Sequence, residues 1–365
     1  MRVRFLVVTA GLLLFAGTAV AGRPTAHTLR KSTGGPIVAI AQSGSVATWL
    51  TFNTNKKACN EVHILSPGKR DRILPQPESG SEVLTCTWDL GDGQPQLAVA
   101  SKISTALWTL HESTQSPVDW VVASSVGGPE RRLTHLVHAS DGTGDWLGGV
   151  AGSGKTLAYS WDDVEYVNPA GCISGGPCKQ RIADGGIRIV TATSDTALPG
   201  VEPALQLAAA AGRIAFVPAT SVHGHRPSAT TNESLPIVNA TTGNVLGQPK
   251  VHGIPLAIAL SPHVFAVLTT LEGPHDRISW FSPANGKKLG SVLIAAGAAA
   301  QLAASDRLIV YRVGRVLRAV STRTGHRTRL AQTALNPLGL SLAGGRLIWA
   351  ENHDHAGRLR AISLR

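Results

Sequence analysis

One phrase of the chain decides its architecture: Leu205-Gln-Leu-Ala-Ala-Ala-Ala-Gly-Arg-Ile-Ala-Phe216. Related phrases run from Ala300 to Tyr311 and from Leu338 to Trp349. Each contains a strand of small apolar residues, a tight turn and a second apolar strand with an aromatic near its end. The phrase occurs about seven times at intervals of roughly 40–58 residues, so the chain is an array of one supersecondary unit.

Repeated hairpins of this length predict an all-β fold, a seven-bladed β-propeller of four-stranded antiparallel blades. Small side chains suit the first strand of each blade, which is crowded near the axis of the ring. One aromatic residue in each second strand is what packing between neighbouring blades needs. These predicted core aromatics are Trp49, Trp108, Tyr159, Phe216, Phe265, Tyr311 and Trp349.

The last unit lacks a fourth strand, because the chain ends just after Leu364. Residues 23–33 offer a short strand ahead of the first blade. We therefore predict that this N-terminal strand completes the last blade and closes the ring, which removes the exposed sheet edges.

Several turns late in the units carry a Thr-Gly or Asn-Gly step, such as Val238-Asn-Ala-Thr-Thr-Gly243, Phe281-Ser-Pro-Ala-Asn-Gly286 and Val320-Ser-Thr-Arg-Thr-Gly325. They resemble the Asp-x-x-Thr-Gly turns of secreted bacterial propeller repeats of the YVTN, quinoprotein-like and TolB-like class. The resemblance implies the propeller fold. The tryptophan that follows the turn in true quinoprotein repeats is missing here, so no quinone is carried over and we expect no cofactor.

The N-terminus has the features of a secretory signal. Met1-Arg-Val-Arg4 precedes an apolar run from Phe5 to Val20, and Ala19-Val-Ala21 is a pattern that signal peptidase accepts. This predicts a signal peptide over 1–21, cleavage near Ala21, and one propeller domain over 22–365. We expect a secreted protein, extracellular or periplasmic, without a transmembrane anchor, because no later run reaches about 18 apolar residues.

Four cysteines fit an oxidising compartment. Cys172 and Cys178 flank a Gly-Gly-Pro loop that a small disulfide could close, which leaves Cys59 and Cys86 as the second predicted pair. Three connectivities are formally possible for four cysteines.

The charge of the chain is unevenly distributed. The formal net charge is +11, and the segment from Gln301 to Arg365 holds eleven Arg, no Lys, and only three acids. A basic sector of this kind favours an anionic partner, and we assign the contact to Arg323, Arg327 and Arg329. The alternative is a solvated surface whose arginines reflect a high-GC genome.

Gly149-Val-Ala-Gly-Ser-Gly-Lys-Thr156 matches the phosphate-loop pattern in full. That mechanism needs a helix after the loop, whose N-terminus meets the phosphates. Here Leu157-Ala-Tyr-Ser-Trp161 is predicted to be a strand, and the same place in other repeats is a hairpin turn. We therefore predict no nucleotide binding.

The sequence contains several clusters of possible metal ligands. Alternate histidines on an extended segment can share a metal, and Glu351 with His353 and His355 is the better of two such clusters. The other is His223 with His225, and the carboxylates of glycine-rich loops that could meet calcium are Asp89, Asp92, Asp141 and Asp145. Solvated loops are the favoured interpretation of all of these.

No nucleophile elbow or zinc-protease motif occurs, and the first strands of the units carry no carboxylate. We therefore expect a non-catalytic, monomeric binding or scaffolding module at the bacterial cell surface or envelope, with no catalytic residues. Its partner would be a protein or an anionic cell-wall polymer, contacted through the long loops on one face. The alternative is a propeller hydrolase or lactonase with a metal near the channel mouth.

Overall fold

The described part of the chain folds into strands joined by turns and loops, without a helix. The computed structural model describes residues 25–32, 35–52, 60–74, 95–112, 118–137, 139, 143–167, 180–219, 230, 232–334 and 337–364. Over these residues there is no helix of the length and apolarity needed to cross a membrane.

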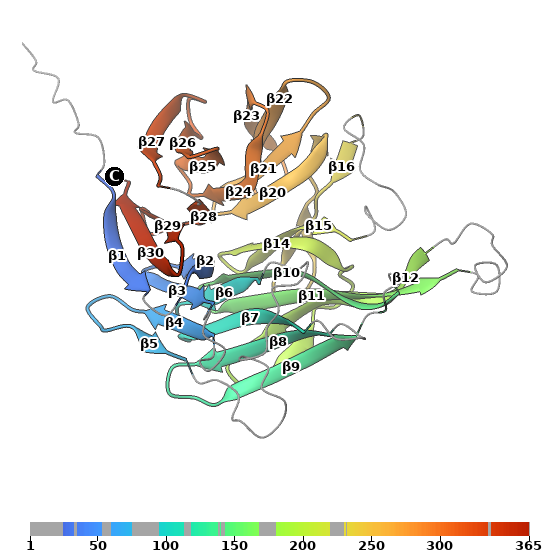
Figure 1. Cartoon of the computed structure of the whole chain (residues 1–365). Coiled ribbons are helices and arrows are strands. Elements are labelled where there is room, and N and C mark those ends of the chain that lie inside the picture. The colour runs from blue at the N-terminus through green and yellow to red at the C-terminus, as the bar shows by residue number, and fades with distance from the viewer. Residues whose placement is uncertain are drawn as a thin grey trace, which may run out of the picture.

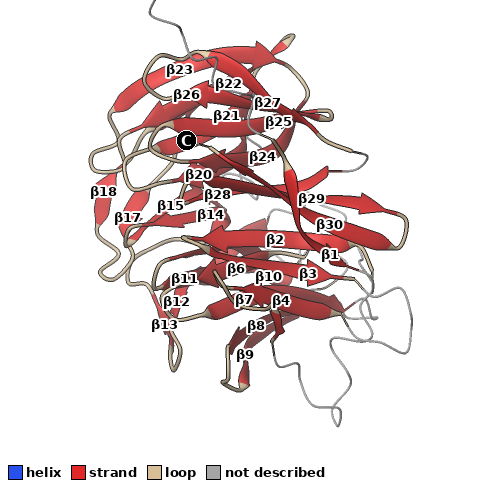
Figure 2. Cartoon of the chain, turned by 90° about the vertical axis from the view of Figure 1, so that its left-hand side faces the viewer, coloured by secondary structure: helices blue, strands red, loops and turns tan. Residues whose placement is uncertain are grey.

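Seven four-stranded antiparallel sheets are arranged around a central axis, as the blades of a β-propeller (Figures 1 and 2). Blades 1 to 3 contain β2 (Ile37–Ser43), β3 (Val46–Thr51), β4 (Glu61–Leu65) and β5 (Arg72–Ile73); β6 (Leu97–Ala100), β7 (Thr105–Glu112), β8 (Val118–Ser125) and β9 (Glu130–Val137); and β10 (Gly144–Ser153), β11 (Thr156–Tyr166), β12 (Gln180–Val190) and β13 (Asp195–Ala197). Blades 4 to 6 contain β14 (Ala204–Ala210), β15 (Arg213–Pro218), β17 (Ile237–Asn239) and β18 (Val245–Gly247); β20 (Ile254–Leu260), β21 (Phe265–Thr270), β22 (His275–Phe281) and β23 (Lys288–Ala295); and β24 (Ala298–Ala304), β25 (Leu308–Val313), β26 (Val316–Ser321) and β27 (Arg327–Gln332). Blade 7 contains β28 (Pro337–Ala343), β29 (Arg346–His353), β30 (Ala356–Ser363) and β1 (His27–Ser32).

The prediction of a seven-bladed ring is therefore confirmed. The first strand of each blade lies nearest the axis, and alternate residues of β20 are buried, as a strand with two different faces requires. Most of these inner strands contain a register shift, for example between Ala204 and Gln206 and between Pro255 and Ala257. Such a bulge bends the strand where the blades converge.

The predicted aromatics lie in the cores between blades. Trp108 and Tyr159 are fully buried, and Phe216, Phe265 and Trp349 are exposed by 2% or less. In five blades an inner-strand residue pairs directly with such an aromatic across the strands, as Ile40 does with Trp49. Blade 5 differs, because Val267 occupies that place opposite Ile258 and Phe265 lies at the start of β21.

Ring closure by the N-terminal strand also occurs. β1 pairs antiparallel with β30, from His27 opposite Ala361 to Ser32 opposite Gly357 (Figure 1). The Asn352 side chain reinforces the join to blade 1, because its Oδ1 accepts from Ile37 N at 2.9 Å and its Nδ2 donates to Ile37 O at 2.8 Å. Gly357 permits this approach, since a Cβ there would lie 2.9 Å from Asn352 Oδ1.

Two blades depart from the plain repeat. In blade 4 a two-stranded sheet, β16 (Asn232–Ser234) with β19 (Lys250–His252), lies beyond the four regular strands. In blade 3 the β11–β12 hairpin projects from the body of the ring, on the right of Figure 1.

Candidate functional site

The inner strands surround a central channel that is divided into two chambers. The larger, of about 550 Å³, lies beside the turns that join the first and second strands of the blades, and we call it the turn-side chamber. The smaller, of about 430 Å³, lies towards the opposite end, and its lining includes Gln96, Gln206 and Gln301. The residues that line both chambers form an apolar waist between them: Ile40, Val150, Leu207, Ile258, Leu302 and Leu340.

We call the turn that joins the first and second strands of each blade its inner turn. Neighbouring inner turns contact one another around the mouth of the turn-side chamber. Ser43 Oγ lies 3.0 Å from Ser101 Oγ and accepts from Gly154 N at 2.8 Å, which joins blades 1, 2 and 3. Gly152 can approach blade 2 because it lacks a side chain, since a Cβ there would lie 2.6 Å from Val99 O. The blade 1–3 side of the mouth is thus tightly packed.

A second candidate site lies on the outside of blade 6. Arg318 of β26 pairs directly with Arg329 of β27, so the two guanidinium groups share one face of the sheet. Arg327, two residues before Arg329, lies on the same face, and its Nη1 donates to Leu293 O of blade 5 at 3.1 Å. We call Arg318, Arg323, Arg327 and Arg329 the blade-6 basic surface; all four are exposed.

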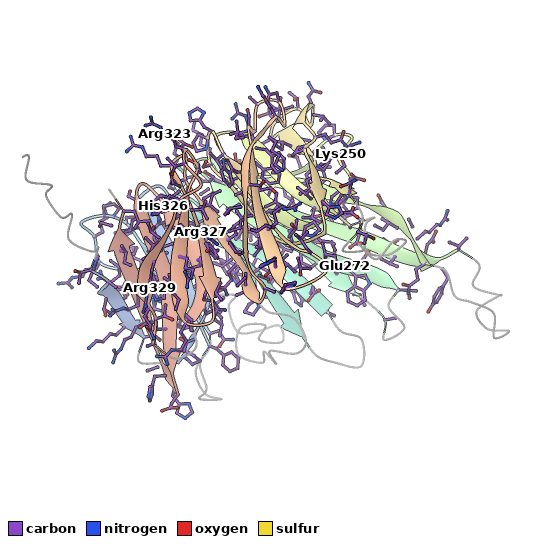
Figure 3. All side chains as sticks on the ribbon, turned by 90° about the horizontal axis from the view of Figure 1, so that it is seen from above. Lys250, Glu272, Arg323, His326, Arg327 and Arg329 are labelled. Carbon is purple, nitrogen blue, oxygen red and sulfur yellow. The ribbon has the colours of Figure 1, made fainter. Side chains whose placement is uncertain are left out.

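Two arginines of this surface lie close enough to Tyr311 to affect its pKa. Burial raises the pKa of the Tyr311 phenol, and the nearby charges of Arg318 and Arg327 partly offset that rise. Figure 3 shows Arg323, Arg327 and Arg329 together on one side of the molecule, away from Lys250. Asp306 is the single acid between Ala298 and Gln332. The surface is therefore locally cationic.

The other arginines of the predicted basic sector lie elsewhere. Arg360 Nε is 3.6 Å from Glu351 Oε2, and its Nη1 donates to Thr28 Oγ1 at 2.7 Å in the closing blade. Arg346 lies at the channel mouth, where it contacts blade 1. Arg346 and Arg360 therefore lie apart from the blade-6 basic surface, and a common anionic partner for the sector from Gln301 to Arg365 stays a prediction.

The candidate metal ligands of the last blade lie in different environments, one buried and two exposed. Glu351 is 8% exposed, and its Oε1 accepts from Trp349 Nε1 at 2.9 Å and from Ala334 N at 3.2 Å. His353 and His355 are exposed at the tip of the β29–β30 hairpin. In the described ranges there is no group of three or more His, Cys, Asp or Glu that could hold a metal ion.

The phosphate-loop pattern lies in a hairpin. Gly149 to Ser153 belong to β10, Thr156 begins β11, and Gly154 with Lys155 forms the turn. A strand stands where the phosphate-loop mechanism needs a helix, as the sequence predicted.

Several predicted features lie outside the described residues. They are the signal peptide over 1–21, the four cysteines Cys59, Cys86, Cys172 and Cys178, the pair His223 and His225, and the carboxylates Asp89, Asp92 and Asp141. Asp145, which is described, lies in β10 opposite Asp163.

With this geometry established, the fold defines the chain as a seven-bladed β-propeller. No protein-family model matches it, and neither does any curated protein, so membership of the YVTN, quinoprotein-like or TolB-like class stays a prediction.

Solved structures show the same fold at low identity. The chain is similar to one in the crystal structure of the mitotic checkpoint complex, at 13% identity and a TM-score of 0.50, with 100% of this chain and 99% of that chain covered. It is also similar to the uncharacterised protein lmo1340 of Listeria monocytogenes, at 9% identity, a TM-score of 0.46, and 87% and 90% coverage. A third is the Dos1 propeller, at 9% identity, a TM-score of 0.44, and 94% and 95% coverage. At these identities the likeness concerns the fold alone.

Proposed function

We propose that this β-propeller is a secreted, non-catalytic binding or scaffolding module of the bacterial cell surface or envelope, with an anionic partner such as a cell-wall polymer. The signal-like N-terminus supports export, with cleavage near Ala21. The blade-6 basic surface supplies the contact.

The observation that carries this proposal is the direct pairing of Arg318 with Arg329. Like charges directly opposite each other on one face of a sheet are destabilising, and an anion bound between them would relieve the repulsion. The Arg329 Nη2 contact to Gln332 Oε1 leaves the guanidinium charge uncompensated, because the Gln332 amide is neutral.

Binding to a heparin resin and to a teichoic-acid resin tests the proposal. The parent should be retained at low salt and elute as salt rises towards physiological strength, where the Debye length is about 8 Å. A variant carrying Arg323→Ser, Arg327→Ser and Arg329→Ser should elute earlier. The matched control carries Lys69→Ser, Arg70→Ser and Lys250→Ser, which removes the same charge from exposed residues elsewhere.

The two variants distinguish an effect of the charges on blade 6 from an effect of the net charge of the protein. The control should elute close to the parent if the partner contacts blade 6. Equal elution of the two triple variants, or retention that does not respond to salt, would contradict the assignment.

A further inference from the structure

Basic residues recur in the inner turns, next to the turn-side chamber. In blades 2 to 7 each inner turn contains, or is followed at once by, a basic residue. We call the lysines and arginines among these residues the rim cations: Lys102, Lys155, Arg213, Arg307 and Arg346; the sixth residue is His263. The inner turns lie next to residues that line the chamber, since Ser153, Pro262, Asp306 and Gly344 are lining residues.

Two rim cations are held in place across blade boundaries. Arg213 Nη1 donates to Pro262 O of blade 5 at 2.8 Å. Arg346 donates from Nε to Gln42 Oε1 and from Nη2 to Ser45 O of blade 1, both at 2.9 Å. Pro262 and Gln42 line the chamber, so each of these guanidinium groups is held next to a lining residue.

These two arginines have no acidic partner among the described residues. Their hydrogen bonds go to neutral carbonyl or amide oxygens. Burial lowers the pKa of Arg346, which reflects the cost of holding a desolvated charge without a counter-charge. An arrangement of this kind is stabilised when an anion binds.

Asp306 is the acidic residue of the inner turns, and its carboxylate accepts hydrogen bonds from the neighbouring inner turn of blade 5. Its Oδ1 accepts from Ser261 Oγ at 2.9 Å and from His263 N at 3.0 Å. The carboxylate therefore orders the inner turn of blade 5. Lys102, Lys155 and Arg307 are exposed in the inner turns of blades 2, 3 and 6, so the inner turns carry more positive than negative charge.

The chamber behind this rim has the size of a small-molecule site. Its volume of about 550 Å³ lies within the usual range for ligand pockets. The lining combines alanines with serine hydroxyls, including Ser43, Ser153 and Ser341, and the apolar waist forms its floor. The rim cations come from separate blades, so a ligand that meets several of them must carry more than one charge.

We propose that the turn-side chamber binds a compact organic anion with two or more carboxylate or phosphate groups. The anionic groups contact the rim cations, and the body of the ligand occupies the chamber. This site is separate from the blade-6 basic surface and does not depend on the function proposed above.

Calorimetric titration of the mature protein at low salt tests this site. Citrate probes for a polycarboxylate and inorganic tripolyphosphate for a polyphosphate, with acetate and maltose as the monoanionic and neutral controls. At least one of the two polyanions should bind with a Kd below about 1 mM, and the controls should not. The probe that binds more tightly identifies the preferred anionic group.

Three variants locate the site. The rim variant carries Lys102→Ser, Lys155→Ser and Arg307→Ser and should bind at least about tenfold more weakly. The charge-matched control variant, which carries Lys69→Ser, Arg70→Ser and Lys250→Ser, should bind like the parent. Ser153→Trp narrows the chamber without changing its charge and should also weaken binding.

Thermal unfolding confirms that each variant is folded. Failure of both polyanions to bind the parent would overturn the proposal. So would equal weakening by the two triple variants, and unchanged affinity in Ser153→Trp would show that the ligand does not enter the chamber. If the parent is not retained on either resin but still binds a polyanion in the titration, the blade-6 assignment is refuted and this site is left intact.

Discussion

The Asn352 amide should contribute substantially to stability, because it joins blade 7 to blade 1. Its two hydrogen bonds satisfy both backbone groups of Ile37, a residue that is 0% exposed. Asn352→Ala leaves a buried N–H and a buried C=O without this partner. Each such loss costs about 1–3 kcal/mol, so we expect the free energy of unfolding to fall by about 2–6 kcal/mol.

Equilibrium unfolding in urea measures this loss, with His353→Ala as the control. The His353 side chain is 79% exposed, so its removal should change stability by less than about 0.5 kcal/mol. Gly357→Ala places a Cβ 2.7 Å from Ile37 Cγ1 and should break the same contact. The two substitutions should therefore be less than additive when combined.

The reasoning about Asn352 would be refuted by two results. One is a loss of less than about 1 kcal/mol in Asn352→Ala. The other is full additivity with Gly357→Ala, which would mean that the two residues act on different contacts.

Three further predictions follow from the closing blade, the cysteines and one buried acid. Deleting residues 23–33 removes β1, exposes the edge of β30 and should lower the melting temperature markedly; a deletion variant that melts like the mature protein would disprove the closure. Non-reducing peptide mapping should find the pairs Cys59–Cys86 and Cys172–Cys178, the first worth about 3 kcal/mol; free thiols or a Cys86–Cys172 peptide would contradict the pairing. Burial raises the pKa of Glu130 to about 7, with Arg132 Nε 3.9 Å away partly offsetting the rise. A raised carboxyl pKa favours the folded state below the unfolded value and loses this advantage as pH rises through about 7. Glu130→Gln should therefore match the parent near pH 4.5 and exceed it by about 1–2 kcal/mol at pH 8, after allowance for solvent screening. Parallel stability–pH curves for the two proteins would count against this assignment.

Much of the ring could be predicted from local signals. The inner turn at Ala211 and Gly212 has positive φ at both residues. The run of small apolar residues before it, which predicts a strand, forms β14. The count of strands in the last unit was enough to predict that an N-terminal strand pairs with it, as β1 pairs with β30. These features depend on a few neighbouring residues, which is why a single sequence reveals them.

Other features depend on contacts between distant segments. The β16–β19 pairing and the length of the β11–β12 hairpin have no counterpart in the other repeats, so the repeat itself could not indicate them. Arg318 belongs to the predicted basic sector, but its place opposite Arg329 follows only once the strand register is known. The rim cations did have a sequence signal, a basic residue in or after successive inner turns, but their convergence at one mouth requires the closed ring.

The position of β1 also has a consequence for how the molecule folds. Most blades pair strands that are adjacent along the chain, and such contacts form quickly. In blade 7 the closing pair joins His27 to Ala361, so it must wait until almost the whole chain is present. Before that step the earlier blades form an open array in which each contacts its neighbours alone, and the join of β1 to β30 turns this array into one cooperative unit.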